Sequence, residues 1–291
     1  MEGAEGFFTV VQPSPWWHWL KSTPAGQKEM RSILRQLVCF DTGKLLAVKA
    51  CHSRNITHRD IKPGEIICPP LFRRYPLFSA FVANVTQKPE VGRLIDFGSA
   101  LDPFTVKHLY GPSGPSRLEQ TNEYAPPEAL LGNHWLYFHS QHAHVYDMWS
   151  VGVVMLELVL GTPHVFQISS RTRALLDRRL QGWDQSAKET AYMLRAFMEM
   201  CILLPGISSH HQFHHQRDNL DNSEEQRLAS WECTEQAFLE QIKQRDILGI
   251  GMPDKWALRL VRRLLQWYPE DRISAEDSLK HPYFHPELQT D

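Results

Sequence analysis

Carboxylate and lysine side chains that could handle a phosphate group lie in short segments that follow one another in a definite order. Asp60 is followed two residues later by Lys62, and a second carboxylate, Asp96, stands before a Phe-Gly pair. Two carboxylates and a lysine are side chains that phosphoryl transfer requires, because a hydroxyl must be oriented, magnesium held and negative charge offset. The segments are His-Arg-Asp-Ile-Lys-Pro-Gly-Glu at 58–65, Asp-Phe-Gly at 96–98, Ala-Pro-Pro-Glu at 125–128, Asp-Met-Trp-Ser-Val-Gly at 147–152 and Pro-Glu-Asp-Arg-Ile at 269–273.

Each segment alone is a weak signal, whereas five of them in this order resemble the catalytic and carboxy-terminal half of the eukaryotic protein kinase domain. The resemblance runs from residue 16 to residue 284. The position of Lys62, two residues after Asp60, resembles the serine/threonine branch of the family. The chain as a whole looks most like the plant kinase-like proteins.

The resemblance implies a role for each matching residue. Asp60 matches the carboxylate that accepts the proton of the attacking hydroxyl, Lys62 the lysine beside the transferred phosphate, and Asp96 a magnesium ligand. The matching structural positions are His58 as a packed core histidine, Arg59 as the partner of a phosphate or carboxylate on the loop 98–125, Asp147 as the anchor of the catalytic loop's backbone, and Glu128 with Arg272 as a buried ion pair. Hydroxyls available on that loop include those of Thr105, Ser113, Ser116 and Thr121.

Two departures from the family pattern argue against catalysis. Glu65 stands where the family has a metal-binding asparagine, and its carboxylate, although able to bind magnesium, would add negative charge opposite a polyphosphate. Gly64 before it would loosen the loop. Only 57 residues precede His58, and no G-x-G-x-x-G occurs in the chain. Most of the family's N-terminal ATP lobe is therefore expected to be missing.

Lys49 is a possible substitute for the missing nucleotide lysine. The segment Ala-Val-Lys at 47–49 resembles the strand that carries the ATP lysine in the family. Lys49 lies only eleven residues before Asp60, however, inside a stretch that predicts a helix. We interpret it as a solvated helix lysine.

The elements that must position these residues are mostly helical. Thr-Pro at 23–24 is a helix-start signal, and apolar residues follow it at helical spacing. Residues 149–160 are apolar on nearly all sides, which predicts a fully buried helix with its N-terminus near Asp147. Further helices are expected at 45–51, 191–204, 256–267 and 275–279, and two strands of a small hairpin at 66–68 and 93–95.

These elements predict a mainly α (α+β) fold. It would be a protein kinase-like C-terminal lobe with a small β-hairpin element, with the N-terminal β lobe largely missing. Residues 1–22 are expected to be an N-terminal remnant, and 23–287 the kinase-like domain. Insertions are expected near 41–44, 69–90 and 205–230.

Composition limits the possible partners and compartments. The chain has 291 residues, 42% of them hydrophobic, and a formal net charge of −2, which leaves no basic footprint for nucleic acid. Its longest apolar stretch, 151–160, is half the ~20 residues that cross a bilayer. Five cysteines without Cys-x-x-Cys spacing fit a reducing compartment. We expect a soluble intracellular protein of the cytoplasm or nucleus that contacts neither nucleic acid nor membrane.

Two clusters have a functional and a structural interpretation. His210, His211, His214 and His215 include pairs at i and i+4, as in a helical metal site, but no acidic or thiol ligand accompanies them at a known spacing, which favours a solvated insertion. Trp16, Trp17 and Trp19 are expected to pack in the core, with an exposed partner-binding patch as the alternative.

The sequence therefore favours an inactive protein kinase-like protein that serves as an interaction or regulatory module for an unidentified protein partner, with no cofactor. The alternative is an active serine/threonine protein kinase, which would transfer the γ-phosphate of ATP to protein hydroxyls with magnesium, using Asp60, Lys62 and Asp96. A hydrolase of another class has no supporting set of residues.

Overall fold

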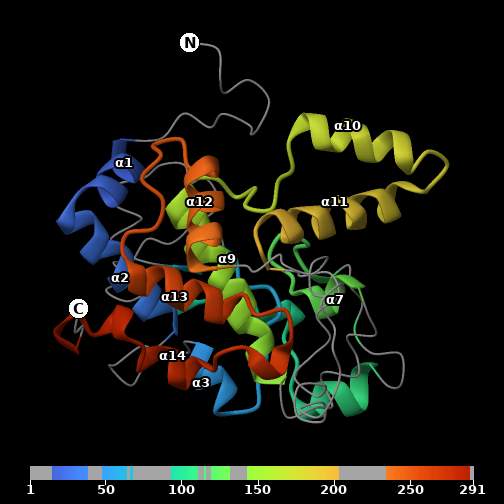
Figure 1. Cartoon of the computed structure of the whole chain (residues 1–291). Coiled ribbons are helices and arrows are strands. Elements are labelled where there is room, and N and C mark those ends of the chain that lie inside the picture. Colours follow the sequence, from blue (N-terminus) through green and yellow to red (C-terminus); the bar gives the residue numbers. More distant parts are fainter. Residues whose placement is uncertain are drawn as a thin grey trace, which may run out of the picture.

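The structure, a computed structural model, describes residues 15–38, 48–63, 66–67, 93–110, 115, 119–131, 143–202 and 234–288. Helices dominate these residues, and they surround one central helix, α9 (Figure 1). The three expected insertions, at 41–44, 69–90 and 205–230, lie outside the described residues, and so does the histidine cluster at 210–215.

Helix α9 (Tyr146–Leu160) is the centre of the core because almost all of its side chains are apolar. All of its residues except Glu157 and Leu158 are buried, as the all-round apolar pattern predicts. The helix ends at Gly161, whose φ of 71° lies in the left-handed region. A Cβ at this position would lie 2.5 Å from the ring of Trp17, so the close approach of α1 also requires glycine there.

Helices α1 (Pro15–Ser22) and α2 (Pro24–Val38) pack against each other, and α2 packs on α9. The start of α2 at Pro24 is as predicted, and the Thr23 hydroxyl accepts the Gly26 N–H at 3.0 Å. Helix α1 was not predicted, because its three tryptophans indicate packing in the core without indicating a helix. Trp17 is buried and its Nε1 donates to the Leu158 carbonyl at 2.9 Å, so it is a core residue and not an exposed patch.

The C-terminal helices cover the other side of the core. Helix α13 (Lys255–Leu264) packs on α9, and α14 (Ala275–Leu279) packs on α2 and on α3 (Val48–His52). The sequence predicted helices over 256–267 and 275–279, close to the observed α13 and α14. Short turns complete this part of the chain: η8 (Pro269–Asp271), η9 (Pro282–Phe284) and η10 (Pro286–Leu288).

The described β-structure consists of two short strands and one isolated bridge. Strands β1 (Ile66–Ile67) and β2 (Arg93–Leu94) pair antiparallel, with Ile66 opposite Leu94. After β2 come η2 (Phe97–Ser99), α6 (Pro103–Thr105), η3 (Val106–Tyr110), α7 (Pro127–Leu131) and η6 (Ala143–Val145).

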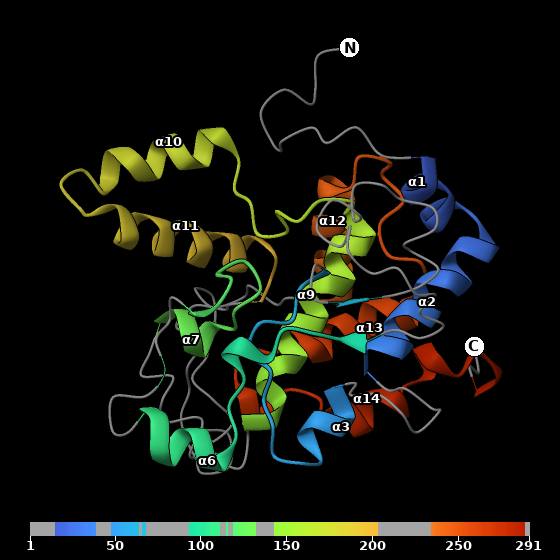
Figure 2. The ribbon, with the colours of Figure 1, turned by 180° about the vertical axis from the view of Figure 1, so that it is seen from behind.

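Helices α10 (Ser170–Arg179) and α11 (Gln185–Glu199) form a hairpin that projects from the body of the molecule (Figure 2). The sequence predicted a helix over 191–204, but α11 begins six residues earlier because the Asp184 side chain caps it by accepting the Ala187 N–H at 2.9 Å. Helices α10 and α12 (Glu235–Arg245) were not predicted. Both are too polar to show an apolar periodicity. The side chains of Ser169 and Thr234 cap their N-termini.

Two further findings concern the cysteines and the length of the apolar helices. Cys51 is a buried free thiol, whereas Cys201 is disulfide-bonded. None of the helices in the described part of the chain is long and apolar enough to span a membrane.

Candidate functional site

The loop that carries Asp60 (residues 57–63, the Asp60 loop) is attached to the loop that carries Asp96 (residues 95–101, the Asp96 loop). Thr57 and Leu101 exchange both backbone hydrogen bonds at 2.8 Å. His58 is fully buried, and its Nε2 donates to the Ile95 carbonyl at 2.9 Å. Its ring also meets the Phe97 ring edge-on at 4.8 Å. The two acidic loops are therefore held together by a packed histidine.

Asp147, at the start of α9, fixes the backbone of the Asp60 loop. Its Oδ2 accepts the His58 N–H and its Oδ1 the Arg59 N–H, both at 2.8 Å. Arg59 has a φ of 71°, a left-handed conformation that costs a non-glycine residue about 1–3 kcal/mol and persists only when its surroundings hold it. The two hydrogen bonds from Asp147 supply that restraint.

His52, at the end of α3, holds Asp147 in turn, with its Nε2 2.9 Å from Oδ2. Burial raises the pKa of Asp147, but the hydrogen bond and charge of His52, with those of His58, hold the net pKa below its usual value. Asp147 therefore remains a buried carboxylate anion. No local pattern in the sequence marks His52, because its partner is 95 residues away.

Asp60, Lys62 and Thr121 form one hydrogen-bonded cluster. The Lys62 Nζ donates to Asp60 Oδ2 at 2.5 Å and to the Thr121 hydroxyl at 2.9 Å, and the Thr121 N–H donates to Asp60 Oδ1 at 2.9 Å. Burial raises the pKa of Asp60, but the hydrogen bonds from Lys62 and Thr121 hold the net pKa below its usual value. An ionised carboxylate in this position can accept a hydrogen bond from an incoming hydroxyl. Thr121 was noted in the sequence only as a hydroxyl open to phosphorylation.

Asp96 is exposed at the start of η2. It adopts a left-handed backbone conformation with a φ of 58°, and its Oδ1 accepts the Gly98 N–H at 3.1 Å. An exposed carboxylate is a chemically suitable magnesium ligand. Glu65, the second proposed ligand, lies outside the described residues. Among those that are described, no group of three or more His, Cys, Asp or Glu side chains is arranged to hold a metal.

The buried Arg59 guanidinium pairs with a carboxylate. Its Nη1 donates to the Ser99 carbonyl at 3.1 Å and to Glu119 Oε2 at 3.2 Å, and the Tyr110 hydroxyl donates to the same oxygen at 3.2 Å. The sequence left open whether a phosphate or a carboxylate would meet Arg59. The structure supplies the carboxylate, so the charge of Arg59 is balanced without phosphorylation.

Glu128 and Arg272 form a bidentate ion pair, although 144 residues separate them. The Arg272 Nη1 and Nη2 donate to the two Glu128 oxygens at 2.7 and 3.0 Å, and both side chains are almost fully buried. The guanidinium also donates to the carbonyls of Val145 and Gln266 and lies 5.3 Å from the centre of the Trp149 ring. The pair thereby attaches α7 to α9 and to the C-terminal helices.

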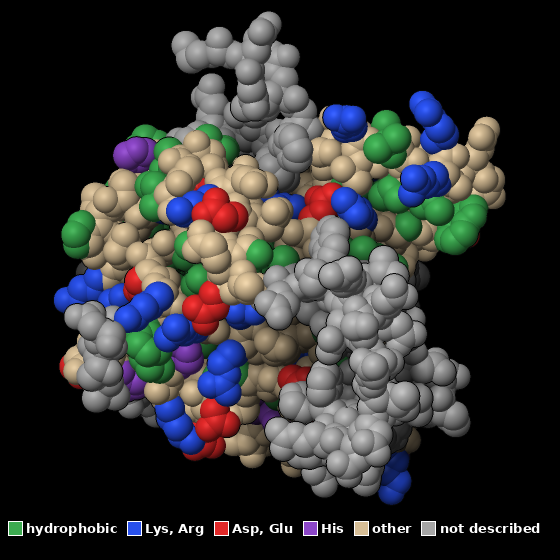
Figure 3. All heavy atoms as spheres, in the orientation of Figure 1, with side chains coloured by type: hydrophobic (Ala, Val, Ile, Leu, Met, Phe, Trp, Pro, Cys, Tyr) green, Lys and Arg blue, Asp and Glu red, His purple; other side chains and the backbone are tan. Residues whose placement is uncertain are grey.

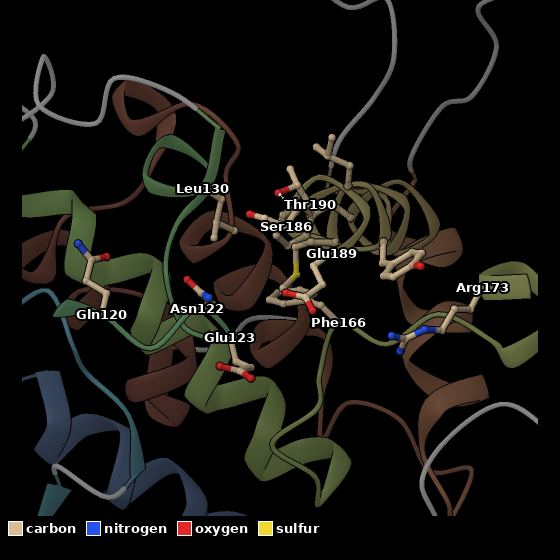
Figure 4. Close-up of a pocket in the computed structure, with 13 residues that line it drawn as sticks. Gln120, Asn122, Glu123, Leu130, Phe166, Arg173, Ser186, Glu189 and Thr190 are labelled. Atoms are coloured by element: carbon tan, nitrogen blue, oxygen red, sulfur yellow. Dashed lines mark hydrogen bonds between the residues drawn. The ribbon is translucent and has the colours of Figure 1, made fainter. Parts of the chain in front are cut away.

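A cavity of about 510 Å³ lies between residues 120–130 and α11. Asn122 and Glu123 line one wall, and Ser186 and Glu189 line the wall formed by α11 (Figure 4). Beside it, Tyr124 donates to Glu157 at 2.7 Å, and burial raises the pKa of Glu157 to about 7. The sequence did not predict this cavity, because it depends on the position of α11.

Lys49 lies on the helix α3 and not on a strand, so the structure gives it no nucleotide-binding role. Its Nζ is 3.9 Å from Glu276 Oε1 of α14, and 43% of its side chain is exposed. The geometry is that of a surface lysine on a helix, as the sequence spacing suggests.

Known proteins match nearly the whole chain. A family model of the protein kinase domain matches residues 8–284. A protein of Arabidopsis thaliana named a probable inactive protein kinase is 53% identical over 279 residues, which cover 95% of this chain and 71% of that protein.

More distant relatives carry the names of kinases. Mouse dual specificity protein kinase CLK1 is 26% identical over 254 residues, 82% of this chain and 42% of that protein. Mitogen-activated protein kinase 15 of Rattus norvegicus is 26% identical over 255 residues, 84% of this chain and 34% of the relative. The chain thus spans less than half the length of these two proteins.

Proposed function

Since this chain belongs to the protein kinase family, we propose that it is an inactive member that works by binding a protein partner. In this proposal the mostly helical kinase domain, with its β1–β2 pair, is the functional unit. The name of the Arabidopsis relative, a probable inactive protein kinase, supports the same assignment.

The observation that carries the proposal concerns the nucleotide lysine. Lys49, in the segment that most resembles the strand of the ATP lysine, lies on a helix beside Glu276. None of the sixteen glycines of the sequence belongs to a G-x-G-x-x-G segment. Glu65 replaces the metal-binding asparagine of the family. Each of these positions serves the nucleotide or its metal, so together they favour loss of phosphoryl transfer.

A second candidate function, serine/threonine phosphorylation with ATP and magnesium, has one observation in its favour. The cluster of Asp60, Lys62 and Thr121 is fully formed, and the lowered pKa of Asp60 keeps its carboxylate ready to orient a hydroxyl. Asp96 would hold magnesium and Lys62 would offset the charge of the phosphate. Such a kinase would still need a nucleotide-binding lysine, and Lys49 on α3 is not placed to serve as one.

Nucleotide binding tests the proposal. We expect the melting temperature of the purified chain to be unchanged by ~100 μM ATP with magnesium, because binding to the native state stabilises it by mass action and an absent site cannot. The matched controls are magnesium alone and the Asp96→Ala variant. Stabilisation of several degrees in the wild type that disappears in Asp96→Ala would contradict the proposal.

A further inference from the structure

The outer face of α10 is exposed, and no other part of the described chain covers it. None of the ten residues of α10 is buried. A helix this short is marginal in water unless a tertiary contact supports it. The contacts that do support it come from α11: Arg173 lies 4.7 Å from the centre of the Tyr192 ring, and the Tyr192 hydroxyl donates to Asp177.

The residues on the opposite side of α10 form a basic and apolar surface. Arg171, Leu175 and Arg178 are spaced by four and three residues, so they share one face of the helix, and Arg179 lies next to it. Leu175 is 50% exposed, and Trp183 in the following turn is 57% exposed. We call these five residues the α10 surface. Figure 3 shows basic and hydrophobic side chains together on the projecting hairpin.

The charge of the α10 surface is not balanced within the described chain. Arg171, Arg178 and Arg179 form no ion pair with a described residue, whereas Arg173 and Asp177 on the inner face are engaged by Tyr192. Helix α10 holds four arginines and one aspartate. Neighbouring like charges on a helix are unfavourable. A surface of this kind is stabilised by a ligand that brings carboxylates.

We propose that the α10 surface binds an acidic, amphipathic segment of a partner protein, with carboxylates on the three arginines and apolar side chains on Leu175 and Trp183. Tryptophan and arginine are the residues that most often dominate protein interfaces. A nucleic acid would use the arginines but leave Leu175 and Trp183 exposed to water, and the hairpin 170–199 carries four acidic residues against six basic ones. This inference rests on the proposed function as an interaction module and names its surface.

The test uses the full chain and a fluorescent synthetic peptide. The peptide forms a helix and carries Glu and Leu on alternate turns. We expect saturable binding below ~100 μM that weakens as salt rises. The variant R171Q/R178Q/R179Q should bind about tenfold more weakly, and Leu175→Ala about threefold more weakly. The matched control K28Q/K107Q/R263Q removes the same charge from exposed residues elsewhere and should change binding less than about twofold.

Circular dichroism and melting curves establish that all variants remain folded. No saturable peptide binding, or equal weakening in the two triple variants, would overturn the proposal. The same holds if the α10 variants weaken binding only to an equally charged DNA duplex or to phosphatidylserine vesicles. The nucleotide titration separates this proposal from the proposed function. A chain that binds ATP and also binds the peptide contradicts the loss of the nucleotide site but keeps the α10 surface. A chain that binds neither keeps the loss of the nucleotide site and overturns the α10 surface.

Discussion

Arg272→Ala should destabilise the protein by about 3–5 kcal/mol, the loss expected when one partner of a buried ion pair is removed. The substitution leaves the buried Glu128 carboxylate without its bidentate partner, and the carbonyls of Val145 and Gln266 lose their donor. A protein stabilised by about 5–15 kcal/mol cannot lose this much without a clear effect. We expect a large fall in the urea unfolding midpoint and in soluble yield.

The control for this prediction is Lys49→Ala. Lys49 is also paired with a glutamate on another helix, but the pair is exposed and its atoms are 3.9 Å apart, so its loss should cost less than about 1 kcal/mol. If Arg272→Ala is as stable as Lys49→Ala, the buried pair does not attach α7 to the helical core as described.

Asp147→Ala should have an effect of similar size, again about 3–5 kcal/mol, for a different reason. The carboxylate accepts the backbone N–H groups of His58 and Arg59 and contacts the ring of His52, all in the protein interior. A buried donor left without an acceptor costs about 1–3 kcal/mol, and Asp147→Ala leaves two backbone donors in that state. Urea unfolding at pH 7 measures this loss.

The conservative variant Asp147→Asn separates the charge from the shape of the side chain. Its amide oxygen can accept only one of the two backbone N–H groups while the NH₂ group faces the other, so we expect an intermediate loss of stability. We also expect faster proteolysis within residues 57–63, because the left-handed Arg59 loses its restraint. Equal stability of wild type, Asp147→Asn and Asp147→Ala would contradict the role given to Asp147.

The sequence predicted those parts of the fold and site that depend on local patterns. The buried helix α9 follows from an apolar run, and Thr23 with Pro24 marks the start of α2. Glu128 and Arg272 could be paired in advance because each is a charge among apolar residues and matches a family segment. Spacing also assigned Lys49 to a helix before the structure placed it on α3.

Contacts between distant segments could not be predicted in this way. Glu119 reaches Arg59 across 60 residues and Thr121 reaches Lys62 across 59, and no periodicity or motif encodes either contact. Helix α10 escaped prediction because its polar sequence has no apolar periodicity and its capping residue, Ser169, is a weak signal on its own. Its exposed face is informative only after the structure shows that the rest of the described chain leaves it uncovered.

The measurement that tests the central claim most directly is transfer of labelled γ-phosphate from ATP, with magnesium, to the protein itself and to a general serine/threonine substrate. Asp60→Asn is the matched control, because it removes the carboxylate that would orient the hydroxyl while keeping the size of the side chain. We predict that the wild-type chain incorporates no more label than Asp60→Asn. Incorporation by the wild type that clearly exceeds that of Asp60→Asn would show an active kinase and contradict this account.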